Sequence, residues 1–133
     1  MAKSAIYTVN TTAPTLAVGD IIPLGNTVRR FGQCIRQDGN AISVCGKGYY
    51  LVTASITATP TAAGTITVNA QKDGVAIPGA TASETVAAAN TNVNLTIAAI
   101  VRNMCDCGGS MLSFVLADAA GVINNIAVTV EKL

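Results

Sequence analysis

Apolar and polar residues alternate with a period of two along most of this 133-residue chain. In residues 49–59 every second side chain, from Tyr50 to Ala58, is apolar, and those between are mostly threonine and serine. The same alternation returns in residues 65–71, 93–101, 112–116 and 126–130. Because successive side chains of a β-strand point to opposite faces of a sheet, each stretch predicts a strand with one face on a hydrophobic core.

Turn-forming residues separate these stretches at short intervals. They are Gly19-Asp20, Gly25-Asn26, Asp38-Gly39-Asn40, Gly46-Lys47-Gly48, Asp73-Gly74, Pro78-Gly79 and Gly108-Gly109. Short strands between such signals are typical of an antiparallel sandwich or barrel. Residues 81–89, which end in three alanines, could form either a short helix or a short strand with a loop. We predict an all-β fold forming a single domain over residues 1–133, with residues 1–25 as its first strands or as a docking arm.

Charge is unusually sparse in this sequence. Charged residues make up 11% of the chain, with a net charge of +1, against about 25% in an ordinary soluble domain. A monomer with so few charges would disperse poorly, so either a membrane or other subunits should cover part of its surface. The longest wholly apolar run, residues 97–101, is far shorter than the ~20 residues of a membrane-spanning helix. We therefore predict association with copies of the same chain and no membrane partner.

The opening residues indicate where the chain is made, and the basic residues indicate which partners it binds. No apolar stretch follows Met1, so we expect no secretory signal and synthesis in a cytoplasm. Lys and Arg together number eight against seven acids, which gives nucleic-acid binding little support. Arg29 and Arg30, near Arg36, form the basic cluster, and we interpret them as an exposed pair beside a strand or as a subunit contact. Ile6 and Tyr7 in the opening segment are further candidate contacts to a subunit or capsid.

The inventory of catalytic side chains is thin. The chain has no histidine, which removes the commonest general base and metal ligand. Asp38 and Asp73 sit in predicted turns, where such side chains cap the backbone. No two carboxylates share a predicted strand at a spacing suited to acid–base work. We predict no enzymatic activity, no cofactor and no catalytic residue.

The four cysteines leave three interpretations open. With Gly39 and Asn40 as a two-residue turn, Cys34 lies opposite Cys45 in a hairpin. Facing Cα atoms about 4.5–5.5 Å apart would permit a disulfide. Cys105 and Cys107 could supply half of a zinc site, although zinc usually takes two or more residues between paired cysteines. In the third interpretation all four are small, buried and unreactive thiols.

The order of features from Gly48 onward resembles a known fold family. The matching segments are Gly48-Tyr49-Tyr50-Leu51-Val52, residues 65–72, the turn Asp73-Gly74, Val75-Ala76-Ile77-Pro78-Gly79-Ala80, the asparagine-spaced strand 92–102, and Asn124-Asn125-Ile126-Ala127-Val128-Thr129-Val130-Glu131. This layout is similar to the tumour necrosis factor-like jelly roll, the fold of the globular heads of complement and short-chain collagens. The resemblance covers about two-thirds of the chain and implies a two-sheet sandwich that forms a compact homotrimer.

Chains this compact with such a layout also resemble small virion proteins of tailed bacteriophages. The resemblance implies a structural role as a capsid decoration or head-fibre protein in the virion, with a major capsid protein or another virion protein as partner. The alternative is a receptor- or carbohydrate-binding tip of a phage fibre or bacterial surface structure. Such tips usually offer exposed aromatic residues, and this chain has three tyrosines, two phenylalanines and no tryptophan.

Overall fold

The structure, a computed structural model, describes residues 3–104 and 109–133, and these form β-strands joined by turns and loops. Within these ranges the strands are β1 (Ala5–Asn10), β2 (Thr15–Leu16), β3 (Asn26–Phe31), β4 (Ile35–Asp38), β5 (Ala41–Val44), β6 (Gly48–Pro60), β7 (Gly64–Lys72), β8 (Val75–Val86), β9 (Val93–Asn103), β10 (Ser110–Ala117) and β11 (Gly121–Lys132). The described residues contain no helix of the length and apolarity that crossing a membrane requires.

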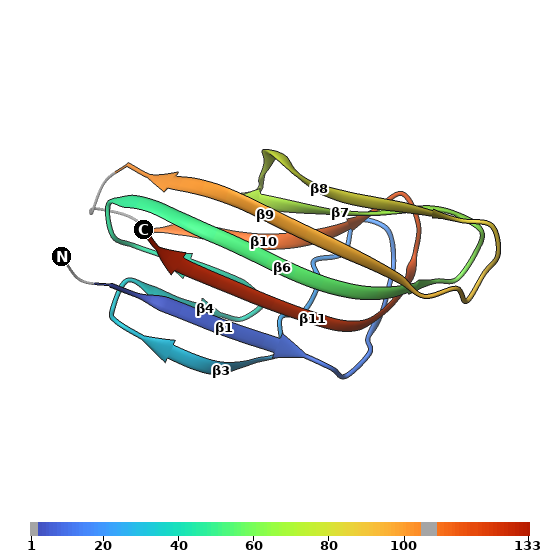
Figure 1. Ribbon diagram of the computed structural model, residues 1–133, viewed down its shortest axis with the longest axis horizontal. Coiled ribbons are helices and arrows are strands. Elements are labelled where there is room, and N and C mark those ends of the chain that lie inside the picture. Colours follow the sequence, from blue (N-terminus) through green and yellow to red (C-terminus); the bar gives the residue numbers. More distant parts are fainter. Residues whose placement is uncertain (1–2, 105–108) are drawn as a thin grey trace.

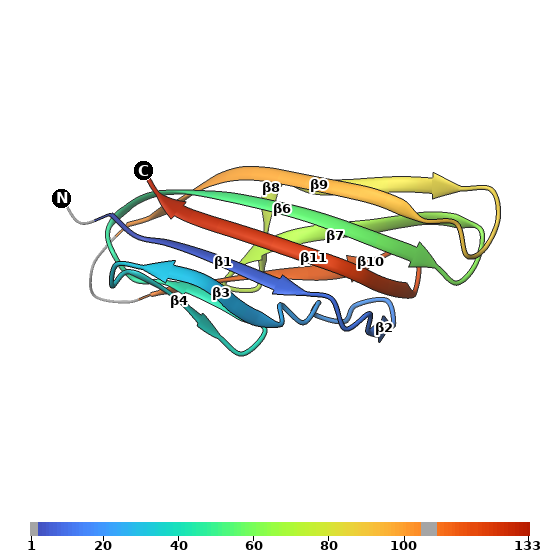
Figure 2. The same ribbon diagram turned by 60° about the horizontal axis from the view of Figure 1, so that its bottom comes forward.

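Two antiparallel sheets pack face to face, as the alternation predicts. One sheet has the order β3-β1-β11-β6-β9, with the short β2 beside β11, and the other has the order β4-β5-β10-β7-β8. Figure 1 looks onto the first sheet, in which β9 and β3 are the two borders, and Figure 2 turns the β3 and β4 side of the sandwich forward. The predicted two-sheet jelly-roll sandwich is confirmed.

The hydrophobic core is built from the alternating rows of the two sheets. Its largest fully buried side chains include Tyr50, Ile56, Phe114, Leu116 and Ile123. Val, Ile and Thr suit such strands because their stiff β-branched side chains pack well on a pleated surface. The residues between the core positions on each strand face outward and form the outer surfaces of the sandwich.

The two tight hairpins form at the predicted turns, and the hairpin between β4 and β5 has the predicted register. Asp73 and Gly74 join β7 to β8 with φ angles of 54° and 82°, and two successive positive φ angles define the type I′ turn that the Asp-Gly sequence favours. In the β4–β5 hairpin, Asp38 pairs with Ala41 and Ile35 with Val44.

Residues 81–89 and residues 1–25 each had two alternatives in the sequence. Residues 1–25 contain β1 and β2 followed by a connection to β3. Residues 81–86 continue strand β8, so of the two alternatives the strand is the one that forms. Ile22 and Leu24 lie in the connection between β2 and β3 yet are fully buried. The backbone N–H of Ile22 donates to the Phe114 carbonyl at 2.8 Å, which fixes this connection against the five-stranded sheet.

Gly25 lies at the end of this connection, and its packing against β1 can be tested with Gly79 on β8 as the control. Both have a positive φ, 73° and 79°. A methyl group on Gly25 would lie 2.3 Å from the Val9 carbonyl oxygen, whereas one on Gly79 would meet nothing within 4 Å. We expect Gly79→Ala to lower the free energy of unfolding by about 1–2 kcal/mol. Gly25→Ala should cost about 1–3 kcal/mol more because of the clash.

Urea denaturation of the two glycine variants beside the parent protein measures this difference. Equal losses of unfolding free energy in the two variants would contradict the close approach of residue 25 to β1.

Candidate assembly surface

The outward face of the six-stranded sheet has an uncharged centre. Cross-strand pairing aligns one row across β1, β11, β6 and β9: Tyr7, Thr129, Thr53 and Ala98. The adjacent row is Val9, Ala127, Ser55 and Thr96. These eight residues are called the uncharged face below. They point away from the core because their neighbours along each strand, such as Val52 and Ala54, are buried in it.

Charges on this side of the sheet stand at its margins. Glu131 pairs with Leu51 near the end of β11, and Arg29 on the border strand β3 pairs with Tyr7. The row on the other side of the uncharged face, formed by Asn125, Thr57 and Asn94, is polar but carries no charge. A broad sheet surface without charge can be covered by another protein without the cost of desolvating an ionised group.

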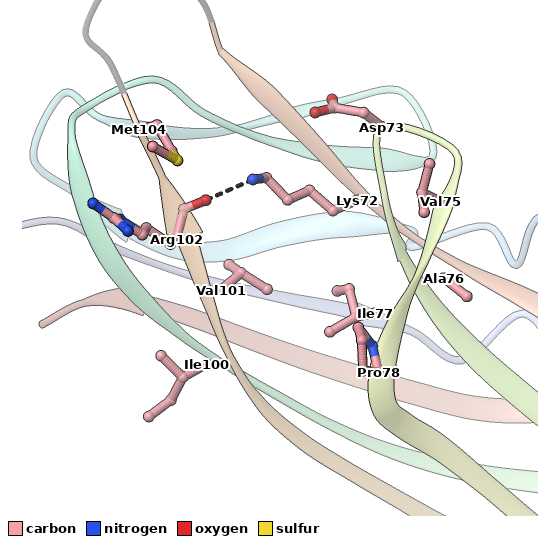
Figure 3. Close-up of a pocket in the computed structure, with 10 residues that line it drawn as sticks. All are labelled: Lys72, Asp73, Val75, Ala76, Ile77, Pro78, Ile100, Val101, Arg102 and Met104. Atoms are coloured by element: carbon pink, nitrogen blue, oxygen red, sulfur yellow. Dashed lines mark hydrogen bonds between the residues drawn. The ribbon is translucent and has the colours of Figure 1, made fainter.

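A groove opens between β8 and β9, where the two sheets end side by side. It has a volume of about 490 Å³, and Figure 3 shows Ile77 and Pro78 facing Ile100 and Val101 across it. Val75, Ile100 and Met104 are 70%, 60% and 64% exposed. The exposed and half-buried apolar residues of this groove are called the apolar edge: Val75, Ile77, Pro78, Ile100 and Met104.

Lysine and arginine side chains mark one end of the apolar edge. The Lys72 ammonium donates to the Arg102 carbonyl at 2.5 Å, which ties β7 to β9 across the groove (Figure 3). The Arg102 guanidinium lies over the Tyr49 ring, 5.7 Å from its centroid. Both contacts leave the apolar side chains of the groove exposed, and a surface of this kind marks an interaction site in a soluble protein.

The predicted contact residues lie on different sides of the strands. Ile6 is 1% exposed and packs in the core, whereas Tyr7 is 38% exposed on the uncharged face. This follows from the alternation of β1, in which consecutive side chains point to opposite faces. Arg29 and Arg30 are exposed, and they lie within the border strand β3 and not beside a strand. The fully exposed β3 has no burial alternation by which the sequence could have revealed it.

Cys34 and Cys45 flank the β4–β5 hairpin as the sequence predicts. The Cys45 N–H donates to the Cys34 carbonyl at 2.9 Å, which extends the pairing by one residue beyond Ile35 and Val44. Both are free thiols, Cys34 half-buried and Cys45 exposed. Cys105 and Cys107, the other half of the predicted zinc alternative, lie outside the described residues. Among the residues described, no group of three or more His, Cys, Asp or Glu lies close enough together to hold a metal ion.

We expect mild oxidation to join Cys34 and Cys45, because facing Cα atoms of paired strands lie within the range that a disulfide spans. A Cys105→Ser/Cys107→Ser variant isolates this pair. Mass spectrometry after oxidation should find the loss of two hydrogens and a crosslinked peptide. The same background with Cys34→Ser is the control. Two thiols that still react with an alkylating reagent after oxidation would contradict the prediction.

Comparison with known proteins shows the fold. No protein-family model and no curated protein sequence matches the chain. Murine APRIL superposes with a TM-score of 0.76 at 14% identity, covering 98% of this chain and 99% of that one. The globular domain of zebrafish complement 1qA gives 0.72 at 7% identity, covering 97% and 95%. The vertex protein P5 of phage PRD1 gives 0.72 at 15% identity, covering 98% and 96%.

These similarities span nearly the whole of each chain. Because the sequence identities are low, they establish a shared fold only. The chain has the tumour necrosis factor-like jelly roll, which confirms the fold implied by the resemblance in the sequence. One of the proteins that share this fold is a phage vertex protein.

Proposed function

We propose that this protein is a structural virion component, a homotrimeric capsid decoration or head-fibre protein of a tailed bacteriophage. The observation that carries the proposal is the presence, on one small subunit, of an uncharged sheet face and an apolar edge beside it. The fold shared with the vertex protein of phage PRD1 supports a place on a virus particle. The role is adhesive, and it requires neither a catalytic group nor a cofactor.

The two surfaces differ in shape and composition, and this difference favours a ring. The uncharged face and the apolar edge are different patches, so a contact that pairs one with the other, and uses each patch once, is not a two-fold contact of one patch with itself. An edge-to-face contact is heterologous, and such contacts form a closed ring when the rotation between subunits divides a full turn. With β9 at the border of the six-stranded sheet, the apolar edge of one subunit packs against the uncharged face of the next. Three copies complete the ring.

The energetics of such a ring are sufficient for a permanent assembly. If each subunit hides about 1,000 Å² of mostly apolar surface, the gross contribution is about 25 kcal/mol at 25 cal/mol per Å². Association entropy and side-chain ordering remove a large part of this. Covering these surfaces also explains the composition. A chain with 11% charged residues needs less charge for solubility once its apolar surfaces are covered by other subunits.

The test of the virion role is the composition of purified particles. Particles induced from the strain that carries the coding sequence, and purified on a density gradient, should contain this chain in a fixed ratio to the major capsid protein. Image reconstruction should then show threefold projections on the shell. Gradient-pure particles that lack the chain would contradict the virion role, while the oligomeric state would be judged separately.

A receptor- or carbohydrate-binding tip is the second candidate, and exposed aromatic residues are the observation that favours it. Tyr7, Phe31 and Tyr49 are 38%, 60% and 51% exposed. Tyr7 lies in the uncharged face, however, and Phe31 pairs with Ala5 at its margin, so assembly would cover this part of the surface. Reproducible binding on a glycan array by the assembled protein would make recognition the leading function.

A further inference from the structure

The border of the sandwich opposite the apolar edge is formed by two end strands, each paired with a neighbour on one side only in the described residues. β3 ends the six-stranded sheet, β4 ends the five-stranded sheet, and they lie close together on the same side of the molecule (Figures 1 and 2). Within the described part of the chain, β3 pairs with β1 alone. All six residues of β3 are exposed, and among the described strands none lies beyond β3 in its sheet. One edge of its backbone can therefore accept a further strand.

A polar hollow of about 300 Å³ lies along this border, lined by Thr27, Arg30, Arg36 and Gln37. The Arg30 Nε donates to the Ile35 carbonyl at 2.7 Å, which fixes that guanidinium between the two strands. Its terminal nitrogens have no partner among the described residues and can bind an anion. The Gln37 amide nitrogen donates to the Gly25 carbonyl at 2.6 Å, and the Thr27 hydroxyl donates to the Gln37 amide oxygen at 2.8 Å. Side-chain bonds therefore hold the wall of the hollow in place.

Among the described residues, the arginines of this hollow have no charged partner. In residues 3–104 and 109–133, no carboxylate lies within ion-pair distance of Arg30 or Arg36. Arginine presents a planar fork of donors that matches a carboxylate in two parallel hydrogen bonds. Two such groups beside a hollow with no acid in its lining form a site for carboxylates supplied from outside.

Open strand edges pair readily with other strands, and charges on them decide which strands they accept. A second copy of β3 laid along the first would bring arginine against arginine, which is unfavourable for directly facing residues. An acidic strand would gain from the same charges. The arginines thus disfavour aggregation of this edge with itself and select a partner of opposite charge.

We propose that the β3 edge binds an extended, acidic segment of another protein as an added strand, with its carboxylates on Arg30 and Arg36. Main-chain hydrogen bonds to β3 would supply affinity, and the two arginines would supply specificity. The inference rests on the proposed function in one respect: the partner is then a shell protein, and this border is the surface by which the trimer attaches. The apolar edge and the uncharged face remain free for assembly.

The test uses the full-length protein, isotope-labelled, and a short acetylated peptide in which glutamate alternates with valine. Titration should perturb the backbone amide signals of β3 and slow their exchange with solvent. The Arg30→Gln/Arg36→Gln variant should bind about tenfold more weakly, since each exposed ion pair contributes a modest amount. The single variant Arg30→Gln should also bind more weakly than the parent. Arg29→Gln is its matched control, because it removes one charge from the same strand on the side that faces Tyr7, and it should bind about as well as the parent.

Two control peptides separate strand addition from simple charge attraction. The same peptide with glutamine for glutamate should bind at least about tenfold more weakly. The glutamate peptide with alternate amides N-methylated keeps its charge but cannot complete the ladder, and it should leave β3 exchange unchanged. Equal binding of either control peptide would overturn the proposal, and so would equal weakening by Arg29→Gln.

Inorganic phosphate in place of the peptide tests for a small-anion site. If phosphate perturbs the two guanidinium groups while the peptide leaves β3 unprotected, the strand proposal is wrong. Light scattering on each variant reports the oligomeric state separately, so that failure of the trimer and failure of this edge are distinguished.

Discussion

Replacing Thr53 with lysine is expected to convert the proposed trimer into monomers. Thr53 lies on the central strand β6, exposed on the uncharged face, and pairs with Thr129 on one side and Ala98 on the other. An ammonium group there would be buried without a partner at each of the three contacts in the ring, and such a group costs several kcal/mol. Multi-angle light scattering at micromolar concentration should find the mass of one chain, 13.4 kDa.

Thr85→Lys makes the same chemical change on the other sheet and serves as the control. Thr85 is exposed on β8, where its hydroxyl bonds to that of Thr65 at 2.8 Å. This variant should remain trimeric, with only a small loss of stability. Far-ultraviolet circular dichroism should show that both variants are folded. A folded Thr53→Lys protein that is still trimeric would show that the uncharged face is not the subunit contact.

Replacing Val75 with lysine should abolish assembly from the opposite side of the contact. Val75 is 70% exposed on the apolar edge, and in the edge-to-face ring it contacts a neighbouring subunit. Each single variant then retains one unaltered contact surface. Thr53→Lys retains the apolar edge, and Val75→Lys retains the uncharged face. A mixture of the two should form a one-to-one dimer through the single intact contact, whereas either variant alone stays monomeric.

Mixing the two variants therefore distinguishes a ring with heterologous contacts from an assembly with symmetric contacts. Sedimentation velocity of the two variants, alone and mixed, provides the measurement, with a mixture of Thr53→Lys and Thr85→Lys as reference. A Val75→Lys protein that remains trimeric would exclude the apolar edge from the contact. Absence of any dimer in the mixture, with both variants monomeric alone, would contradict the edge-to-face arrangement.

Much of the fold could be predicted because the buried strands carry a strict alternation. Tyr50 to Ala58 on β6 and Leu112 to Leu116 on β10 show apolar side chains at every second position, and all of these are buried. The hairpin of Cys34 and Cys45 followed from its two-residue turn, since turn length sets the register of the flanking strands. Local chemistry was sufficient in these cases.

The parts that could not be predicted are those where burial does not alternate. β3 is exposed along its whole length, so its sequence Asn26–Phe31 has no core face to reveal it. Ile22 and Leu24 are buried in a connection without regular structure, where periodicity carries no information. Residues 81–86 were ambiguous because Ser83, Glu84 and Thr85 are all exposed on a border strand.

The candidate surfaces were anticipated through the low charge of the chain and, for one residue of the uncharged face, through Tyr7 as a candidate contact. Composition indicated that some surface must be covered, but it could not say which, because a face is defined by residues brought together from four strands. Tyr7, Thr53, Ala98 and Thr129 are far apart in the sequence and adjacent in the sheet. The groove between β8 and β9 likewise depends on the meeting of two sheet borders.

The proposed function requires that this jelly roll form a trimer through non-covalent contact between its sheet surfaces. The most direct test is the mass of the purified protein in solution by light scattering, with and without reductant and over a range of dilutions. We predict three times the 13.4 kDa of the chain, independent of reductant and stable on dilution to micromolar concentration. A stable monomer in dilute buffer, or a trimer that falls apart on reduction, would contradict it.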